Sequence, residues 1–233
     1  MYLKSIHAII SAVRALFNNR RPLLLMLGIY TALLAAIYLF VSTREATISQ
    51  LLLTLVTVVA APALFFVLQA IIVGPTSRNL IKNTLKLIVV TVPMIALMLL
   101  VVHVLNKFET HPTIVTTVRY LLIAVIGPLL VIQLWITVSN GMHVRNVLSQ
   151  TFAPQSMFVY AFGFLIFAVV PYLLLRKPLT LHRPWLELSL MIVRLSLSAL
   201  LVLIGWILTV RALSILNSKG GTPWPPLQSN DRA

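Results

Sequence analysis

The sequence predicts an all-α, polytopic membrane protein with six transmembrane helices in three sequential hairpins. Of the 233 residues, 60% are hydrophobic and 9% are charged, whereas soluble domains carry about 25% charged residues. So few charges cannot cover a water-facing surface of this size, so lipid must surround most of the chain. A second observation, an internal repeat, groups the apolar segments in pairs.

The repeat is marked by a short basic motif that returns four times. The copies begin at Arg14, Arg78, Arg145 and Arg211, which are 64, 67 and 66 residues apart. Two long apolar runs lie between each pair of copies. A fixed period of this kind indicates a repeat architecture. We therefore expect three hairpins, each introduced by a cytoplasmic amphipathic elbow, with pseudo-threefold symmetry.

Residues 1–21 show the pattern of an amphipathic helix that lies in the membrane interface. Their apolar residues recur with a period near 3.6, and a basic polar face lies opposite: Leu3, Ile6, Ile10, Val13 and Phe17 against Lys4, His7, Ser11, Arg14 and Asn18. A cleavable signal would show a short apolar core and a small-residue cleavage site instead.

Six apolar spans follow, and each is near the ~20 residues needed to cross the hydrocarbon core. They are expected at residues 23–41, 48–73, 86–105, 118–139, 156–175 and 187–210. Residues 1–217 thus form a single membrane domain. The Gly- and Pro-rich tail, residues 218–233, is typical of a disordered cytoplasmic segment.

The distribution of Lys and Arg orients the spans. Eleven lie on the side of the N-terminal segment, the 74–86 and 140–155 loops and the tail, against six on the opposite side. The positive-inside rule then places both termini in the cytoplasm, in a prokaryotic plasma membrane. All four repeat arginines fall on that face, where we expect Arg14, Arg78, Arg145 and Arg211 to meet anionic lipid headgroups. The formal net charge of +14 therefore indicates a membrane surface and not nucleic acid.

The opposite face carries one basic loop. Arg176, Lys177 and Arg183 come just before Trp185. A short loop with an aromatic anchor contacts headgroups in many membrane proteins. The same residues could also form an anion or lipid-headgroup site in the outer leaflet.

Aligned repeats also place three residues at one depth. Pro62, Pro128 and Arg194 are 66 residues apart and are expected in the middle third of the bilayer. Each proline should kink its helix and free the carbonyl four residues earlier. Gln69 and Gln133 follow on the same two helices and could either satisfy polar groups or simply join neighbouring helices.

Arg194 is the strongest candidate for a functional residue, because an ionised side chain within a span is costly. Glu187 lies seven residues earlier on the same helical face. Arg194 either forms a structural ion pair with Glu187 or lipid phosphate, or lines a polar cavity that holds an anionic group. In the second case Arg194, Glu187, Gln69 and Gln133 form a candidate anion or lipid site.

Motifs for catalysis and cofactors do not occur. The chain has no cysteine and only four acidic residues, all in loops or near span ends, and its five histidines do not converge. No carboxylate pair can be placed for acid–base chemistry, and no ligand set for a metal or haem. We therefore expect no enzyme activity, no cofactor and no metal.

With the elbow-and-hairpin plan established, the chain resembles a broad group of bacterial six-helix membrane proteins. This group includes the membrane domain fused to some glycerophosphodiester phosphodiesterases, together with uncharacterised relatives. The resemblance covers residues 1–217 and rests on the Arg14, Arg78 and Arg145 segments and the Asn18-Asn-Arg-Arg-Pro22 entry to the first span. It implies a membrane domain of unassigned role. The phosphodiesterase domain has no counterpart in this sequence, so its activity is not implied.

Two classes of function remain. The first is a non-catalytic scaffold or accessory subunit that contacts lipid or a protein partner. The second is a transporter, flippase or lipid-binding protein that uses Arg194 for an anionic group. The scarcity of polar residues within the spans favours the first, because a transport pathway normally needs more of them.

Overall fold

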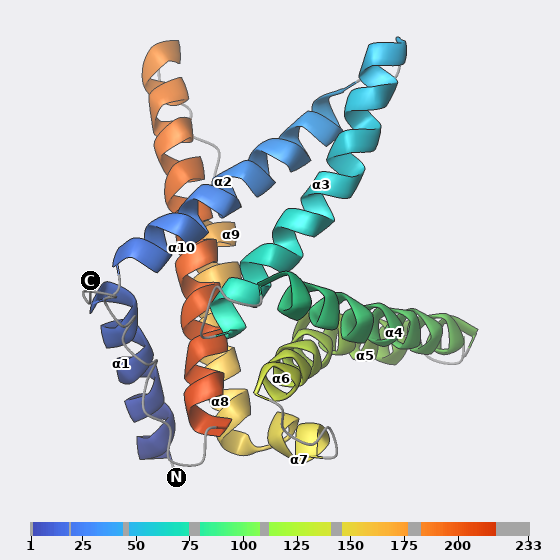
Figure 1. Cartoon of the computed structure of the whole chain (residues 1–233), viewed down its shortest axis with the longest axis vertical. Coiled ribbons are helices and arrows are strands. Elements are labelled where there is room, and N and C mark those ends of the chain that lie inside the picture. The colour runs from blue at the N-terminus through green and yellow to red at the C-terminus, as the bar shows by residue number, and fades with distance from the viewer. Residues whose placement is uncertain are drawn as a thin grey trace, which may run out of the picture. The chain divides into compact units, whose positions relative to one another are not determined.

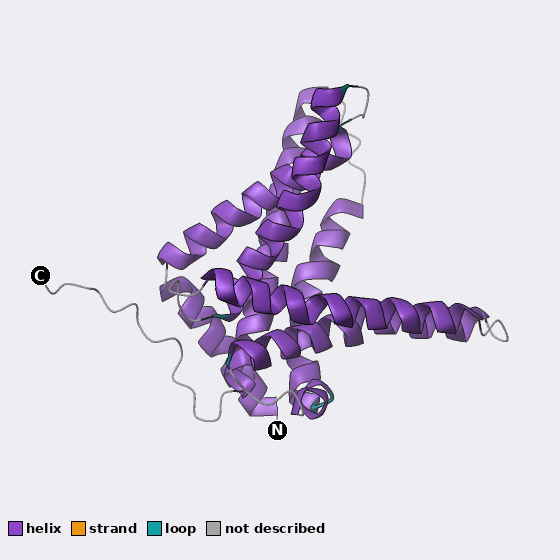
Figure 2. Ribbon diagram, turned by 45° about the vertical axis from the view of Figure 1, so that its right-hand side comes forward, coloured by secondary structure: helices purple, strands orange, loops and turns teal. Residues whose placement is uncertain are grey.

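The computed structural model describes residues 2–18, 20–43, 47–74, 80–107, 112–140, 146–176 and 183–217. Within these ranges all regular structure is helical, which confirms the all-α fold class (Figure 2). Six helical segments are long and apolar enough to cross a membrane, and each overlaps one of the six predicted spans: Arg20–Ser42, Ile48–Val73, Leu80–Leu105, Val115–Ser139, Pro154–Arg176 and Trp185–Asn217.

The helices belong to two compact units (Figure 1). The terminal unit joins the two ends of the chain and contains α1 (Tyr2–Asn18), α8 (Pro154–Phe164), η4 (Leu165–Val169), α9 (Val170–Arg176) and α10 (Pro184–Asn217). The central unit contains α2 (Arg20–Ser42), α3 (Ile48–Val73), α4 (Leu80–Lys107), α5 (Pro112–Leu121), η2 (Leu122–Ile126), α6 (Gly127–Ser139) and α7 (Val147–Thr151).

Local sequence signals explain where several helices begin and end. The hydroxyl of Thr47 accepts a hydrogen bond from the backbone N–H of Gln50 at 3.4 Å and caps α3, as N-terminal Thr residues commonly do. Gly74 ends that helix, so α3 has the bounds predicted for the second span. The helices α5, α8 and α10 each begin on a proline, whose missing N–H is not needed in the first turn.

Two other prolines are accommodated by π-helical turns. In η2 the N–H of Gly127 donates to the Leu122 carbonyl, and in η4 the N–H of Val170 donates to the Leu165 carbonyl. In both turns the donor immediately precedes a proline, Pro128 or Pro171. The wider turn gives the N–H group before each proline an acceptor within the helix, as a lipid environment requires.

The π turns therefore do not follow the repeat. Pro128 lies just after a π turn, whereas Pro62 lies within an uninterrupted α-helix, as does Pro93. Pro171 has the same local geometry as Pro128 without sharing its position in the repeat. An i to i−5 bond just before the proline, and not a position in the period of 66, is what Pro128 and Pro171 have in common.

The four elbow segments also differ from one another. The first forms the separate helix α1, and the third includes the short helix α7. Residues 80–83 instead begin α4 without a break, and residues 211–217 continue α10 to its end. Pro22 and Pro154 come within four residues of the ends of the two separate helices, whereas residues 84–92, which follow the second segment, contain no proline. Arg78, Arg145, Lys177 and the tail 218–233 lie outside the described residues.

Close packing holds α8, η4 and α9 against α10 in the terminal unit. A Cβ on Gly163 would overlap the Thr209 side chain, and a Cβ on Gly205 would lie 2.9 Å from Ile166 and from the backbone of Phe167. Phe167 also contacts Trp206 edge-on, with ring centroids 5.4 Å apart. Small residues at such crossings let helix backbones approach closely. The two spans that these helices form, Pro154–Arg176 and Trp185–Asn217, correspond to the third predicted hairpin.

In the central unit, α6 is the most buried helix and contacts both α3 and α4. The indole Nε1 of Trp135 donates to Thr91 Oγ1 on α4 at 2.7 Å. Its ring meets Phe65 of α3 edge-on, with centroids 6.2 Å apart. The close approach of α4 and α6 continues at Gly127, where a Cβ would lie 2.6 Å from Met98 Cε.

Candidate functional site

Helix α1 presents three different faces. Ser5, Ala8, Ala12 and Leu16 are buried and form one stripe along the helix, on which α1 packs against α10 and α8 (Figure 1). The predicted apolar residues form a second stripe that stays exposed: Leu3, Ile6, Ile10 and Phe17. The predicted polar residues form the third, with Lys4, His7 and Arg14 exposed.

The packed face of α1 was not recognised from the sequence. Its small residues allow a close approach to the neighbouring helices, and Ser5 Oγ donates to the Gln155 carbonyl of α8 at 3.5 Å. The sequence does contain a pattern that indicates this face, because Ser5, Ala8 and Ala12 recur at helical spacing. Because this stripe attaches α1 to the unit, both the apolar and the basic face remain available to the surroundings.

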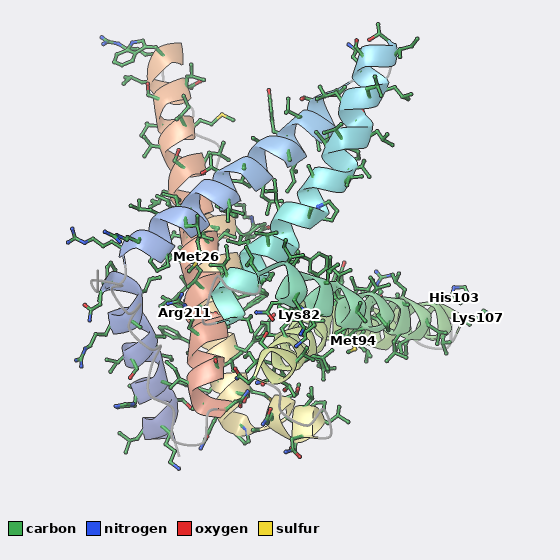
Figure 3. The ribbon with its side chains drawn as sticks, viewed as in Figure 1. Met26, Lys82, Met94, His103, Lys107 and Arg211 are labelled. Atoms are coloured by element: carbon green, nitrogen blue, oxygen red, sulfur yellow. The ribbon has the colours of Figure 1, made fainter. Side chains whose placement is uncertain are left out.

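The two repeat arginines within the described ranges have different environments. Arg14 is exposed on α1. Arg211, on α10, is only 7% exposed (Figure 3), so it is not the lipid-facing residue that its place in the repeat predicted. The reason is that α10 continues through this copy of the motif, and its last turns pack within the terminal unit.

The four residues of the candidate anion site divide between the units. Arg194 and Glu187 lie on α10 in the terminal unit and are half-buried. Gln69 of α3 and Gln133 of α6 lie in the central unit, and both are fully buried. Arg194 and Glu187 are therefore described as one pair, and Gln69 and Gln133 as another, each within its own unit.

Most of the described hydroxyl groups in the spans bond within their own helix. Thr57, Thr137 and Thr209, for example, donate to carbonyls four residues earlier at 3.0, 2.7 and 2.6 Å. This bonding satisfies a hydroxyl without water or a partner helix. Thr91 also donates within its own helix, to the Leu87 carbonyl, and in addition accepts the Trp135 indole N–H.

The predicted headgroup residues that the structure describes, Arg176 and Arg183, lie where α9 ends and where α10 begins. Arg176 is exposed in the last turn of α9, and its guanidinium lies 5.9 Å from the ring centroid of Tyr172. Arg183 is exposed just before α10. Arg119 of α5 makes a similar contact with Tyr120, at 5.6 Å. Arginine beside an exposed tyrosine is typical of the membrane interface.

No cluster of three or more potential metal ligands occurs among the residues that the structure describes. His103 is exposed in the penultimate turn of α4, four residues before Lys107 (Figure 3). Glu109 and His111, which follow it in the sequence, lie outside the described ranges.

Comparison with known proteins adds no family. No family model, no curated protein and no solved structure matches this chain. The class of this protein therefore rests on its six apolar helices. The chain is a multi-pass integral membrane protein.

Proposed function

We propose that this chain is a non-catalytic membrane scaffold or accessory subunit that contacts anionic lipid or a protein partner. In this proposal the protein lies in a prokaryotic plasma membrane with both termini in the cytoplasm, as the excess of Lys and Arg on that side favours. The observation that carries the proposal is the three-faced helix α1.

The faces of α1 fit a role in contacting lipid. One face attaches the helix to α10 and α8, so its position does not depend on membrane binding. The exposed apolar side chains, such as Leu3 and Phe17, suit acyl chains, and the neighbouring Lys4 and Arg14 suit anionic headgroups. A helix with a purely structural role would need only the packed face.

The interior of each unit supports a non-catalytic role. The helix crossings are filled by glycine, threonine and aromatic side chains, as at Gly163 with Thr209 and at Trp135 with Phe65. Hydroxyl groups in the spans bond mainly to their own helix. Such interiors stabilise a fixed arrangement of helices and supply few groups for proton transfer or for conducting a polar substrate.

One observation favours the second candidate, a transporter, flippase or lipid-binding protein. Arg194 lies within the sixth span and is half-buried. A guanidinium in that position could hold an anionic group. A transporter or flippase of this kind requires that Arg194 help to move an anion or lipid across the bilayer, which the scaffold does not.

Site-directed labelling of α1 tests the first proposal, and the chain has no cysteine of its own. A spin label at Phe17→Cys should lie among acyl chains in reconstituted bilayers, and one at Arg14→Cys should lie in the headgroup region or in water. Equal water exposure of the two labels would contradict the lipid role of α1. A control label at Ala12→Cys, on the packed face, should be immobile in both detergent and lipid.

A flux assay separates the two candidates. Proteoliposomes that carry the protein should move fluorescent anionic phospholipid between leaflets no faster than protein-free vesicles. Faster movement that is lost in Arg194→Leu would replace the scaffold proposal with the transport proposal.

A further inference from the structure

We propose that the basic face of α1 binds a phospholipid whose headgroup carries two phosphates, with Lys4 and His7 on one phosphate and Arg14 on the other. The proposal rests on the lipid-contacting function above and names the class of lipid and the residues that recognise it. Cardiolipin, in which one glycerol joins two phosphatidyl groups, is a lipid of this class.

The donor side chains of this face are unevenly spaced along the helix. Lys4, His7 and Arg14 are all exposed. Lys4 and His7 are three residues apart, so they are neighbours on the helix surface and can share one phosphate. Arg14 is seven residues beyond His7, ~10 Å along the axis. Side chains on a helix lean in the same direction, so this separation is largely kept at their ends. The face therefore offers two phosphate positions.

Ser11 lies between these positions and orients His7. Its hydroxyl oxygen is 3.5 Å from His7 Nδ1. When the neutral ring accepts a hydrogen bond from this hydroxyl, the proton of the imidazole is on Nε2, which then donates outward. In the charged ring both nitrogens carry protons, so Nε2 again donates. Because Ser11 bonds to His7, it does not form a third phosphate position.

The spacing suits two phosphates that belong to one headgroup. In cardiolipin six bonds of about 1.5 Å join the two phosphorus atoms, which are therefore at most ~8 Å apart. Donors ~10 Å apart can then contact the two phosphates from outside, through hydrogen bonds of ~3 Å. Once the first phosphate is bound, the second is held nearby at high effective concentration. Two separate lipids with one phosphate each lack this advantage.

Acyl chains of the same lipid have a surface beside the donors. Each polar residue of the face directly follows an apolar residue, which points ~100° away around the helix. The pairs are Leu3-Lys4, Ile6-His7, Ile10-Ser11 and Val13-Arg14. Leu3, Ile6 and Ile10 are exposed. A headgroup bound to the basic face can therefore place its chains along the apolar face at the same level.

The basic face is also held in a fixed direction. The buried stripe of α1 packs against α10 and α8, and Ser5 bonds to the Gln155 carbonyl, so the helix cannot roll freely about its axis. Donors that are positioned before binding lose less entropy when a ligand binds. This attachment favours recognition of one headgroup over a general attraction to negative charge.

No described carboxylate of the terminal unit competes for these donors. Its one acidic residue is Glu187, in the first turn of α10. The contacts of Gly163 with Thr209 and of Phe167 with Gly205 show that α8 and α10 run antiparallel. The start of α10 is therefore at the opposite end of the unit from Gln155, to which α1 is bonded.

Native mass spectrometry of the full chain tests the proposal. Cardiolipin, phosphatidylglycerol or phosphatidylcholine is added to the purified protein in detergent, and retained lipid is counted over a concentration series. The wild type should retain cardiolipin at about tenfold lower concentration than phosphatidylglycerol, the gain expected from one more charge-assisted contact. Arg14→Gln, and the double variant Lys4→Gln with His7→Gln, should each lose this tenfold advantage, because one phosphate position remains in each.

Arg183→Gln is the matched control, because Arg183 is also an exposed arginine of the terminal unit. It should keep the full preference for cardiolipin. Equal retention of cardiolipin and phosphatidylglycerol by the wild type would overturn the proposal, as would an unchanged preference in Arg14→Gln. Displacement of cardiolipin by millimolar inorganic phosphate would assign the face to free phosphate and would also contradict it.

A spin label at Ile10→Cys locates the binding on α1, since residue 10 lies between the two phosphate positions. In detergent, cardiolipin should reduce the mobility of this label at about tenfold lower concentration than phosphatidylglycerol does, and Arg14→Gln should remove the difference. A label that does not respond to cardiolipin would overturn the inference.

This result is separable from the test of the proposed function. Equal responses to the two lipids, with the Phe17→Cys label among acyl chains, would remove the two-phosphate site alone. Water exposure of the Phe17→Cys label would remove the proposed function itself.

Discussion

Replacing Gly163 with alanine should destabilise the terminal unit, although alanine is normally the better helix former. In an open helical position the change from glycine to alanine stabilises by about 1 kcal/mol. At Gly163 the new Cβ would overlap Thr209 Oγ1 and lie 2.8 Å from Thr209 Cβ. Threonine is branched at Cβ and has few other rotamers within a helix, so the backbones must move apart.

The expected size of the effect follows from these two opposing terms. Overpacking in a well-packed interior costs about 1–3 kcal/mol, which outweighs the gain in helix propensity. We therefore expect Gly163→Ala to lower the free energy of unfolding by up to about 2 kcal/mol. Gly28 provides the control, because a Cβ there meets nothing within 4 Å. Gly28→Ala should be neutral or stabilising.

The assay is reversible unfolding in mixed detergent micelles with increasing sodium dodecyl sulfate, followed by far-UV circular dichroism. The double variant Gly163→Ala with Thr209→Gly removes all three contacting atoms. It should be more stable than the sum of the two single effects predicts, by about 1 kcal/mol or more. If Gly163→Ala were as stable as Gly28→Ala, α8 and α10 could not approach as closely as the structure shows.

Three further outcomes are expected. Trp135→Phe should lower the free energy of unfolding by about 1 kcal/mol through loss of the indole hydrogen bond. Thr91→Val should lower it at least as much, because this change leaves a buried indole N–H unsatisfied. Equal stability of both variants and the wild type would contradict this contact. Gly127→Ala should also lower the free energy of unfolding, by about 1–2 kcal/mol, because its Cβ would lie 2.9 Å from the Leu122 carbonyl that closes the π turn. The same unfolding titration measures this change. A gain in stability would argue against that turn. For topology, membrane-impermeant maleimide should label Ser77→Cys and Thr180→Cys from opposite sides of the membrane, and labelling of both from one side would end the six-span arrangement.

The sequence alone determined the class of this protein and the number of its spans. Hydrophobic runs near 20 residues are a one-dimensional property, because each helix satisfies its own backbone in lipid regardless of its neighbours. The bounds of α3 were predicted from its apolar run alone, and Thr47 and Gly74 cap the two ends through bonds in the adjacent turns. The two exposed faces of α1 were also predictable, because they depend only on spacing along one helix.

Tertiary structure decided the local helix geometry and burial of individual residues, which the repeat could not predict. Equal spacing placed Pro62, Pro128 and Arg194 together, but a π turn precedes only Pro128. Arg211 is buried, although the motif predicted it beside lipid, because α10 continues and packs there. Depth, burial and close contact depend on which helices meet and at which residues, and a period along the chain carries no information about that choice.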